Sequence, residues 1–83
     1  MTLDVLYFAW LRERIGAPRE RVETTAATVG ALVAELAARD DRHAAALSDL
    51  SAVRVAVDQD LADWDTPLAG AREVAFFPPM TGG

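Results

Sequence analysis

The sequence predicts an α+β fold, in which one mixed β-sheet carries one main helix packed on one face. Runs of β-branched, aromatic and long apolar residues lie near both ends of the 83-residue chain. A single longer amphipathic stretch lies between them. Two strands, one helix with one apolar stripe and two further strands fit a sheet with the helix laid across it.

The first half of the chain predicts two strands. Residues 3–10, LDVLYFAW, carry apolar side chains at odd and even positions, which favours a strand in the middle of a sheet. The charges of LRERIGAP, with Gly16 and Pro18, end this strand and turn the chain. Residues 21–25, RVETT, form the second strand, and we expect the two strands to pair as a hairpin.

The main helix is predicted to begin after Thr28, a residue type that often caps helix N-termini. Its apolar stripe follows the i, i+3, i+4, i+7 spacing of an amphipathic helix and consists of Val29, Leu32, Val33 and Leu36. Residues 42–47, RHAAAL, add a further helical turn.

Two more strands are expected in the last third of the chain. Residues 52–58, AVRVAVD, alternate between apolar and polar and predict the third strand. Residues 60–72 predict an irregular connection, since they include Asp65, Pro67 and Gly70. Residues 73–77, EVAFF, predict the last strand.

The ββαββ order is that of the ubiquitin-like β-grasp, whose first and last strands lie side by side and parallel in the centre of the sheet. We therefore expect a β-grasp domain over residues 1–79 and a flexible, extended C-terminal tail over residues 80–83, ending in Gly-Gly.

Strand parity predicts which side chains face away from the helix. Asp4 and Phe8 share one face of the first strand, and Glu73 and Phe77 share one face of the last. The faces that carry the carboxylates should be the ones without the helix. Loops could partly shield the two phenylalanines. Alternatively, Phe8 and Phe77 could form a partner-binding patch, which Leu61, in the loop between the last two strands, would extend.

Composition excludes several classes of function. Cysteine is absent, which removes disulfides, thiolate metal sites and thiol nucleophiles. The formal charge is −5 and all eight cations are arginines, so a nucleic-acid partner is not expected. No apolar run has the length of a membrane span, and the N-terminus does not have the pattern of a signal peptide. We expect a cytoplasmic protein without a bound metal.

The residues do not predict catalysis by this chain alone. His43 is the only histidine, and we expect it to be structural or solvated. The carboxylate pair Asp40 and Asp41 and the pair Asp58 and Asp60 fit capping and turn roles equally well. The glycines do not have the spacing of a nucleotide-binding loop. No stably bound cofactor is expected.

The tail is the exception, because its own carboxylate can be the reactive group. Pro78 and Pro79 end the sheet and favour an extended exit. Four residues follow, namely Met80, Thr81, Gly82 and Gly83. Fully extended, they would reach about 14 Å beyond the fold. Glycines without Cβ atoms let a narrow channel close around the backbone. A frayed end or a processing remnant is the alternative.

Two motifs resemble the small, sulfur-carrying subunit of molybdopterin synthase. Members of that family have an F-A-x-x-R-E-x-x-G stretch and a P-P-x-[ST]-G-G tail. Matching positions are Phe8, Ala9, Arg12, Glu13 and Gly16 in the first motif, and Phe77, Pro78, Pro79, Thr81, Gly82 and Gly83 around the second. The chain departs from the family at Ala71 and Arg72, where Gly-Asp is usual.

The resemblance implies a sulfur carrier in molybdenum cofactor biosynthesis. A separate adenylyltransferase of the ubiquitin-activating type would adenylate Gly83 with ATP, and a sulfur donor protein would convert it to a thiocarboxylate. The large synthase subunit would receive the tail, with Met80, Thr81 and Gly82 in its channel, and pass the sulfur to cyclic pyranopterin monophosphate. The resemblance also assigns Phe8, Leu61 and Phe77 to the hydrophobic contact with that subunit.

Three other functions share parts of this pattern. A carrier that delivers sulfur to the thiazole of thiamine has the same fold and tail, but usually lacks FFPP before it. A ubiquitin-like modifier would join Gly83 to lysines of target proteins. A regulatory β-grasp module would have no use for a free Gly-Gly end. The product formed on Gly83, a thiocarboxylate or a protein conjugate, distinguishes a sulfur carrier from a protein modifier.

Overall fold

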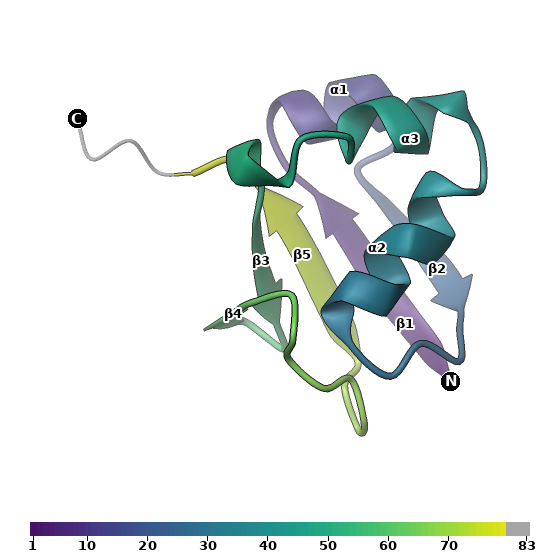
Figure 1. Ribbon diagram of the computed structural model, residues 1–83, viewed down its shortest axis with the longest axis vertical. Helices are drawn as coiled ribbons and strands as arrows, with labels where there is room; N and C mark the ends of the chain where they lie inside the picture. The colour runs from purple at the N-terminus through teal and green to yellow at the C-terminus, as the bar shows by residue number, and fades with distance from the viewer. Residues whose placement is uncertain (80–83) are drawn as a thin grey trace.

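Five strands, three α-helices and one short 3₁₀-helix make up the fold over residues 1–79, the part of the chain that the computed structural model describes (Figure 1). In chain order they are β1 (Thr2–Tyr7), α1 (Trp10–Ile15), β2 (Arg19–Glu23), α2 (Val29–Ala37), α3 (Asp41–Ala46), η1 (Leu50–Ala52), β3 (Arg54–Val57), β4 (Asp60–Ala62) and β5 (Glu73–Phe77).

The strands form one mixed sheet in the order β2-β1-β5-β3-β4. β1 runs parallel to β5 and antiparallel to β2, while β3 is antiparallel to both β5 and β4. The first and last strands are therefore neighbours at the centre, as predicted, and Figure 1 shows them side by side. This topology, with α2 across the sheet, confirms the ubiquitin-like β-grasp.

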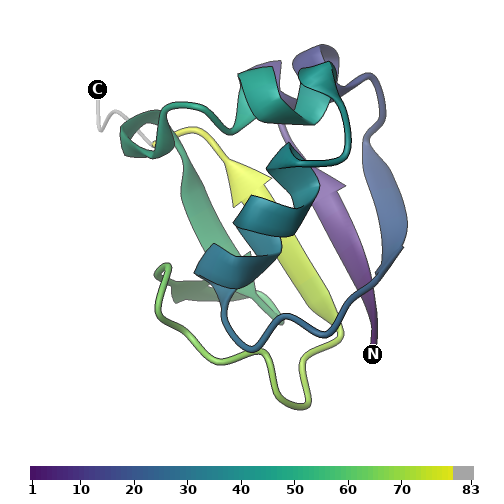
Figure 2. The same ribbon diagram turned by 45° about the vertical axis from the view of Figure 1, so that its right-hand side comes forward.

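Helix α2 crosses one face of the sheet, and α1 and α3 lie together at one end of it (Figures 1 and 2). The Thr28 hydroxyl caps α2 by accepting a hydrogen bond from the Ala31 backbone N–H, at 3.2 Å. All four predicted stripe residues are buried, namely Val29, Leu32, Val33 and Leu36. Close packing explains the glycine at position 30, because a Cβ there would lie 3.1 Å from the Trp64 carbonyl oxygen.

Residues 10–15 form a helix where the sequence predicted the end of a strand and a turn. β1 ends at Tyr7, and the chain changes direction at Ala9, whose φ of 53° is rare for a residue with a Cβ. In α1, Leu11 and Ile15 are one turn apart and both are buried. Gly16 then ends the helix with a φ of 92°. β1 and β2 do pair as predicted, but a helix connects them.

The predicted connection over residues 60–72 contains a strand that was missed. β4 is only three residues long and pairs with β3 across a tight turn at Asp58 and Gln59. Both turn residues have positive φ, 49° and 72°, as a two-residue hairpin turn of type I′ requires. Leu61 thus lies on an edge strand, and its predicted place in a loop is wrong.

The turn before β5, which contains Ala71 and Arg72, is held by backbone hydrogen bonds. Gly70 takes the positive φ, 79°, and the Ala71 N–H donates to the Leu68 carbonyl at 3.0 Å. One carboxylate oxygen of Asp58 accepts the backbone N–H groups of Arg72 and Glu73, each at 2.9 Å. The start of β5 is therefore fixed by the hairpin turn beside it.

Within residues 1–79, no helix is long and apolar enough to cross a membrane. The same residues contain no group of three or more histidine or acidic side chains that could hold a metal ion.

Candidate functional site

The two faces of the sheet differ in what covers them. Leu3, Val5 and Tyr7 of β1 point toward the helices and are at most 1% exposed. Val74 and Phe76 of β5 point the same way and are fully buried. The alternate residues of these strands lie on the other face, which no helix of the described chain covers (Figures 1 and 2). We call this second surface the open face.

Phe8 and Phe77 lie on the open face, as parity predicted, and share one hollow there. Phe8 is 45% exposed and Phe77 is partly exposed. The hollow has a volume of about 650 Å³ and is lined by Leu6, Phe8, Ala9, Gln59, Glu73, Ala75, Phe77, Pro78 and Pro79. Most of these side chains are apolar, and a hollow of this kind is typical of a surface that receives a partner.

Strand register places two residues that line the hollow, Leu6 and Ala75, in one row with residues of β3 and β4. Leu6 pairs with Ala75, Ala75 with Ala56, and Ala56 with Leu61, so these four residues form one row across β1, β5, β3 and β4. Of this row, Leu6 and Ala75 line the hollow together with Phe8 and Phe77. Sequence analysis did not single out Leu6 or Ala75, although the same parity places both on this face.

Leu61 lies at the rim of the open face, outside the hollow. It is 78% exposed, and among the described residues it lines a neighbouring depression of about 310 Å³ together with Arg54 and Trp64. The structure therefore brings Phe8 and Phe77 together and places Leu61 two strands away from β5, at the sheet edge. Whether all three contact one partner stays a prediction.

The hollow ends where the chain leaves the sheet. β5 stops at Phe77, and Pro78 and Pro79 line the hollow directly after it. The predicted reactive residue, Gly83, and the predicted channel residues Met80, Thr81 and Gly82 lie outside the described residues. Their roles stay predictions, whereas the path that leads to them begins at the aromatic end of the open face.

Comparison with protein families identifies the chain. The model of the ThiS family matches residues 5–83, which is nearly the whole sequence. The chain belongs to the ThiS family.

Known proteins that match this chain over nearly its full length support this assignment. The molybdopterin synthase sulfur carrier subunit of Escherichia coli is 46% identical over 98% of this chain and 99% of that protein. The subunit of the same name in Haemophilus influenzae is 40% identical, with the same coverage. The crystal structure of SAMP1 from Haloferax volcanii superposes with a TM-score of 0.76, at 27% identity over the whole of both chains. The resemblance stated from the two motifs is confirmed.

The protein also has a partly buried polar network on the helix side of the sheet. The Glu20 carboxylate accepts a hydrogen bond from the Tyr7 hydroxyl at 2.6 Å. It also forms an ion pair with Arg39 at 3.0 Å. His43 lies between two carboxylates, with Nε2 2.6 Å from Glu20 Oε2 and Nδ1 2.8 Å from Asp40 Oδ1. Both ring nitrogens face acceptors, so the doubly protonated imidazolium fits this place best.

The network shifts the pKa values of its members in opposite directions. Burial and the hydrogen bond to Glu20 raise the pKa of Tyr7. Burial opposes charge on His43, but hydrogen bonds to Glu20 and Asp40 outweigh it and raise the pKa of the imidazole. Burial likewise opposes charge on Glu20, and hydrogen bonds from Tyr7 and His43 nevertheless lower its pKa. The network ties β1 and β2 to α3, and none of its members reaches the open face.

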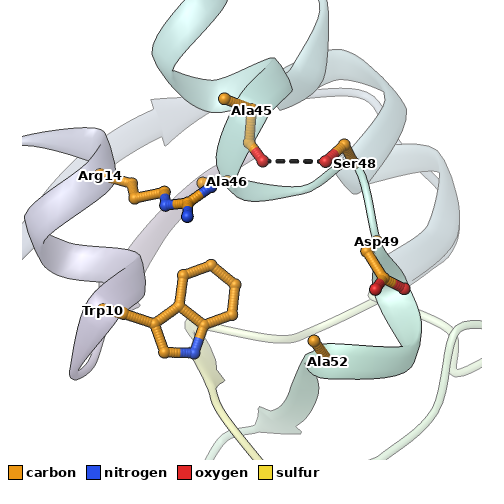
Figure 3. A pocket seen from close by; sticks show the side chains of 7 residues that line it. All are labelled: Trp10, Arg14, Ala45, Ala46, Ser48, Asp49 and Ala52. Atoms are coloured by element: carbon orange, nitrogen blue, oxygen red, sulfur yellow. Dashed lines mark hydrogen bonds between the residues drawn. The ribbon is translucent and has the colours of Figure 1, made fainter.

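Another groove of this protein lies between α1, α3 and η1 (Figure 3). It has a volume of about 370 Å³ and is lined by Trp10, Arg14, Ala45, Ala46, Ser48, Asp49 and Ala52. The Arg14 guanidinium lies 5.5 Å from the centre of the Trp10 ring, a cation–π distance. The groove contains none of the predicted site residues, so the open face remains the candidate site.

Proposed function

We propose that this chain is the sulfur carrier of a molybdopterin synthase, with Gly83 as its reactive C-terminus. The observation that carries the proposal is the apolar hollow of the open face, which ends at Pro78 and Pro79. A partner seated on the hollow would receive the residues beyond Pro79 directly. The full-length identity to sulfur carrier subunits supports the same function.

In this function the tail carries the chemistry. A carboxylate is a poor acyl donor, so an adenylyltransferase of the ubiquitin-activating type first joins the Gly83 carboxylate to AMP, with ATP as substrate and pyrophosphate as product. A sulfur donor protein then supplies the sulfur that replaces AMP, which leaves a thiocarboxylate. These steps use ATP and place the protein in the cytoplasm, where ATP is available.

The large synthase subunit is the proposed acceptor. Phe8, Leu61 and Phe77 contact it, Met80, Thr81 and Gly82 lie in its channel, and the thiocarboxylate donates sulfur to cyclic pyranopterin monophosphate there. Two deliveries complete the dithiolene that binds the metal. The carrier itself supplies reach and a docking surface, and acts without catalytic side chains. Burial of the exposed phenylalanine surface would stabilise the complex by about 25 cal/mol for each Å² of apolar area.

The product found on Gly83 tests this function. Protein purified from its native cells is analysed by intact mass and by mapping of its C-terminal peptide. We expect a fraction in which one oxygen of the Gly83 carboxylate is exchanged for sulfur. An isopeptide link between Gly83 and a lysine of another protein would instead establish a ubiquitin-like modifier.

The thiamine-thiazole carrier would give the same thiocarboxylate, so a second measurement separates it. The loaded protein is mixed with the large synthase subunit and cyclic pyranopterin monophosphate, and in parallel with a thiazole synthase and its substrates. Sulfur transfer to the pterin supports the proposal. Transfer only in the thiazole reaction would replace it with the alternative.

A further inference from the structure

Two charged groups lie at opposite ends of the open face. Glu73 begins β5 and lines the hollow, on the side of the Asp58–Gln59 turn. Arg54 begins β3 and pairs in register with Phe77, so its side chain shares the face of that phenylalanine. Glu73 and Phe77 are four residues apart along β5, which separates the two charged positions by about 13 Å.

Glu73 and Arg54 have no ionic partner among residues 1–79. The Glu73 backbone N–H is bound by Asp58, but its carboxylate makes no ion pair there. The Arg54 guanidinium makes only a 3.3 Å hydrogen bond to the neighbouring Val53 carbonyl. A carboxylate and a guanidinium are thus both free to meet a partner, one on each side of the row formed by Leu6, Ala75, Ala56 and Leu61.

The next acidic group on this face is neutralised, which makes Glu73 distinct. Asp4 pairs with Glu73 in the parallel register of β1 and β5. Its carboxylate lies 3.3 Å from the Arg21 Nε and 3.6 Å from an Arg19 guanidinium nitrogen. Both arginines come from β2 and leave Glu73 unpaired. A cation arriving at Glu73, beside Arg72 in a small depression, would meet a carboxylate that has no ion pair among residues 1–79.

Apolar contact alone would not fix how a partner sits on this face, because the hydrophobic effect has no direction. Opposite charges at the two ends do provide direction. A partner turned by half a circle on the hollow would place like charges against Glu73 and Arg54, and like charges suppress such docking. The direction matters because Pro78 and Pro79 leave the sheet only at the Arg54 end.

We infer that Glu73 and Arg54 set the orientation of the large synthase subunit on the open face. This inference rests on the proposed function and names the chemistry of the partner surface. That surface has an apolar centre, a lysine or arginine placed against Glu73, and an aspartate or glutamate placed against Arg54. The two contacts direct the chain beyond Pro79 toward the acceptor site.

The test compares neutral variants with matched controls. Glu73→Gln and Arg54→Gln each remove one charge from the open face. Asp65→Asn and Arg42→Gln make the same changes of net charge at exposed positions on the loop before β5 and on α3. The affinity and association rate for the large subunit are measured at low and at physiological salt, and thermal melting checks that each variant is folded.

We expect the two open-face variants to lose affinity on the order of 10-fold, mainly through slower association at low salt, and to depend less on salt. The controls should stay within about twofold of the wild type. Neutralising the basic residues of the large subunit one at a time should then identify one whose loss weakens wild-type binding but has little further effect on Glu73→Gln.

The outcomes separate this inference from the function on which it rests. If the wild type binds the large subunit, and Glu73→Gln and Arg54→Gln bind as the controls do, the orientation role is wrong and the proposed function stands. If the wild type does not bind at all, both are wrong. If Asp65→Asn changed affinity as much as Glu73→Gln, and Arg42→Gln as much as Arg54→Gln, the effect would follow net charge and not position, which would also overturn the orientation role.

Discussion

Phe76 and Phe77 are neighbours in the chain but lie on opposite faces of the sheet. Phe76 is fully buried beneath the helices and stacks on Tyr7, with 6.1 Å between ring centres. Phe77 lines the hollow of the open face. One aromatic residue therefore serves the core, and the next one is available to a partner.

Replacing Phe77 with alanine should weaken partner binding more than it weakens the fold. Truncation of a buried interface aromatic commonly costs about 2 kcal/mol of binding free energy or more. Chemical unfolding and affinity for the large synthase subunit are measured on the same protein. A large loss of stability with unchanged affinity would show that Phe77 acts as a core residue.

Replacing Phe76 with alanine should have the opposite result. Removal of a fully buried phenylalanine costs about 3 to 5 kcal/mol of unfolding free energy, which for a domain of this size can abolish folding. Urea unfolding followed by circular dichroism measures the loss. A well-folded Phe76→Ala protein beside an unfolded Phe77→Ala protein would contradict the face assignment.

The His43 network makes stability depend on pH. The pKa of His43 is raised in the folded protein above its ordinary value of 6.5. Its stabilising effect is therefore complete below pH 6.5 and is lost as the pH rises through the folded-state pKa. The pKa of Glu20 is lowered from 4.5, so its contribution is complete above pH 4.5 and is lost as the pH falls through the lower folded-state pKa.

This dependence is tested by measuring the unfolding free energy at pH values about one unit apart, from about pH 5.5 to about pH 9. We expect the wild type to lose stability across the upper part of that interval. His43→Gln keeps a polar side chain without a titrating imidazole, so its stability should change less over the same range. Parallel curves for the two proteins would remove His43 as the cause.

The tail should be dispensable for folding and essential for sulfur delivery. Deletion of Gly83 shortens the reach by about 3.5 Å, and Gly82→Val adds a branched side chain without changing the reach. Both proteins should melt near the wild-type temperature, because residues 80–83 follow the last strand. Adenylation and pterin dithiolene formation are then assayed with each. Normal rates for Gly82→Val would contradict a narrow channel, and normal rates for the deletion would contradict the carrier function itself.

Local sequence patterns predicted those helices and strands whose bounds follow from the residue types and spacing within the element itself. The bounds of β5, the Thr28 cap and the apolar stripe of α2 follow from residue type and spacing alone. Helix α1 was missed because the apolar run of β1 continues to Trp10, and the break depends on the positive φ of Ala9. Strand β4 was missed because its turn uses Asp58 and Gln59 instead of the glycines typical of such turns.

The candidate site was predictable to the extent that it depends on alternation along a strand. Parity was sufficient to place Phe8 and Phe77 on the open face. The pairing of Arg54 with Phe77 depends on the register between β3 and β5, which residue types do not specify. The network of Tyr7, Glu20 and His43 joins positions 13 and 23 residues apart, and no local pattern indicates such contacts.

The parallel pairing of β1 with β5 also bears on how the protein is made. Val5 pairs with Val74, roughly 70 residues later in the chain, so the centre of the sheet cannot close until the last strand has left the ribosome. A nascent chain interrupted before β5 lacks its middle strand and exposes the apolar side of β1. Such a fragment is a substrate for chaperones and proteases. Synthesis through Phe77 is thus a condition for a folded domain.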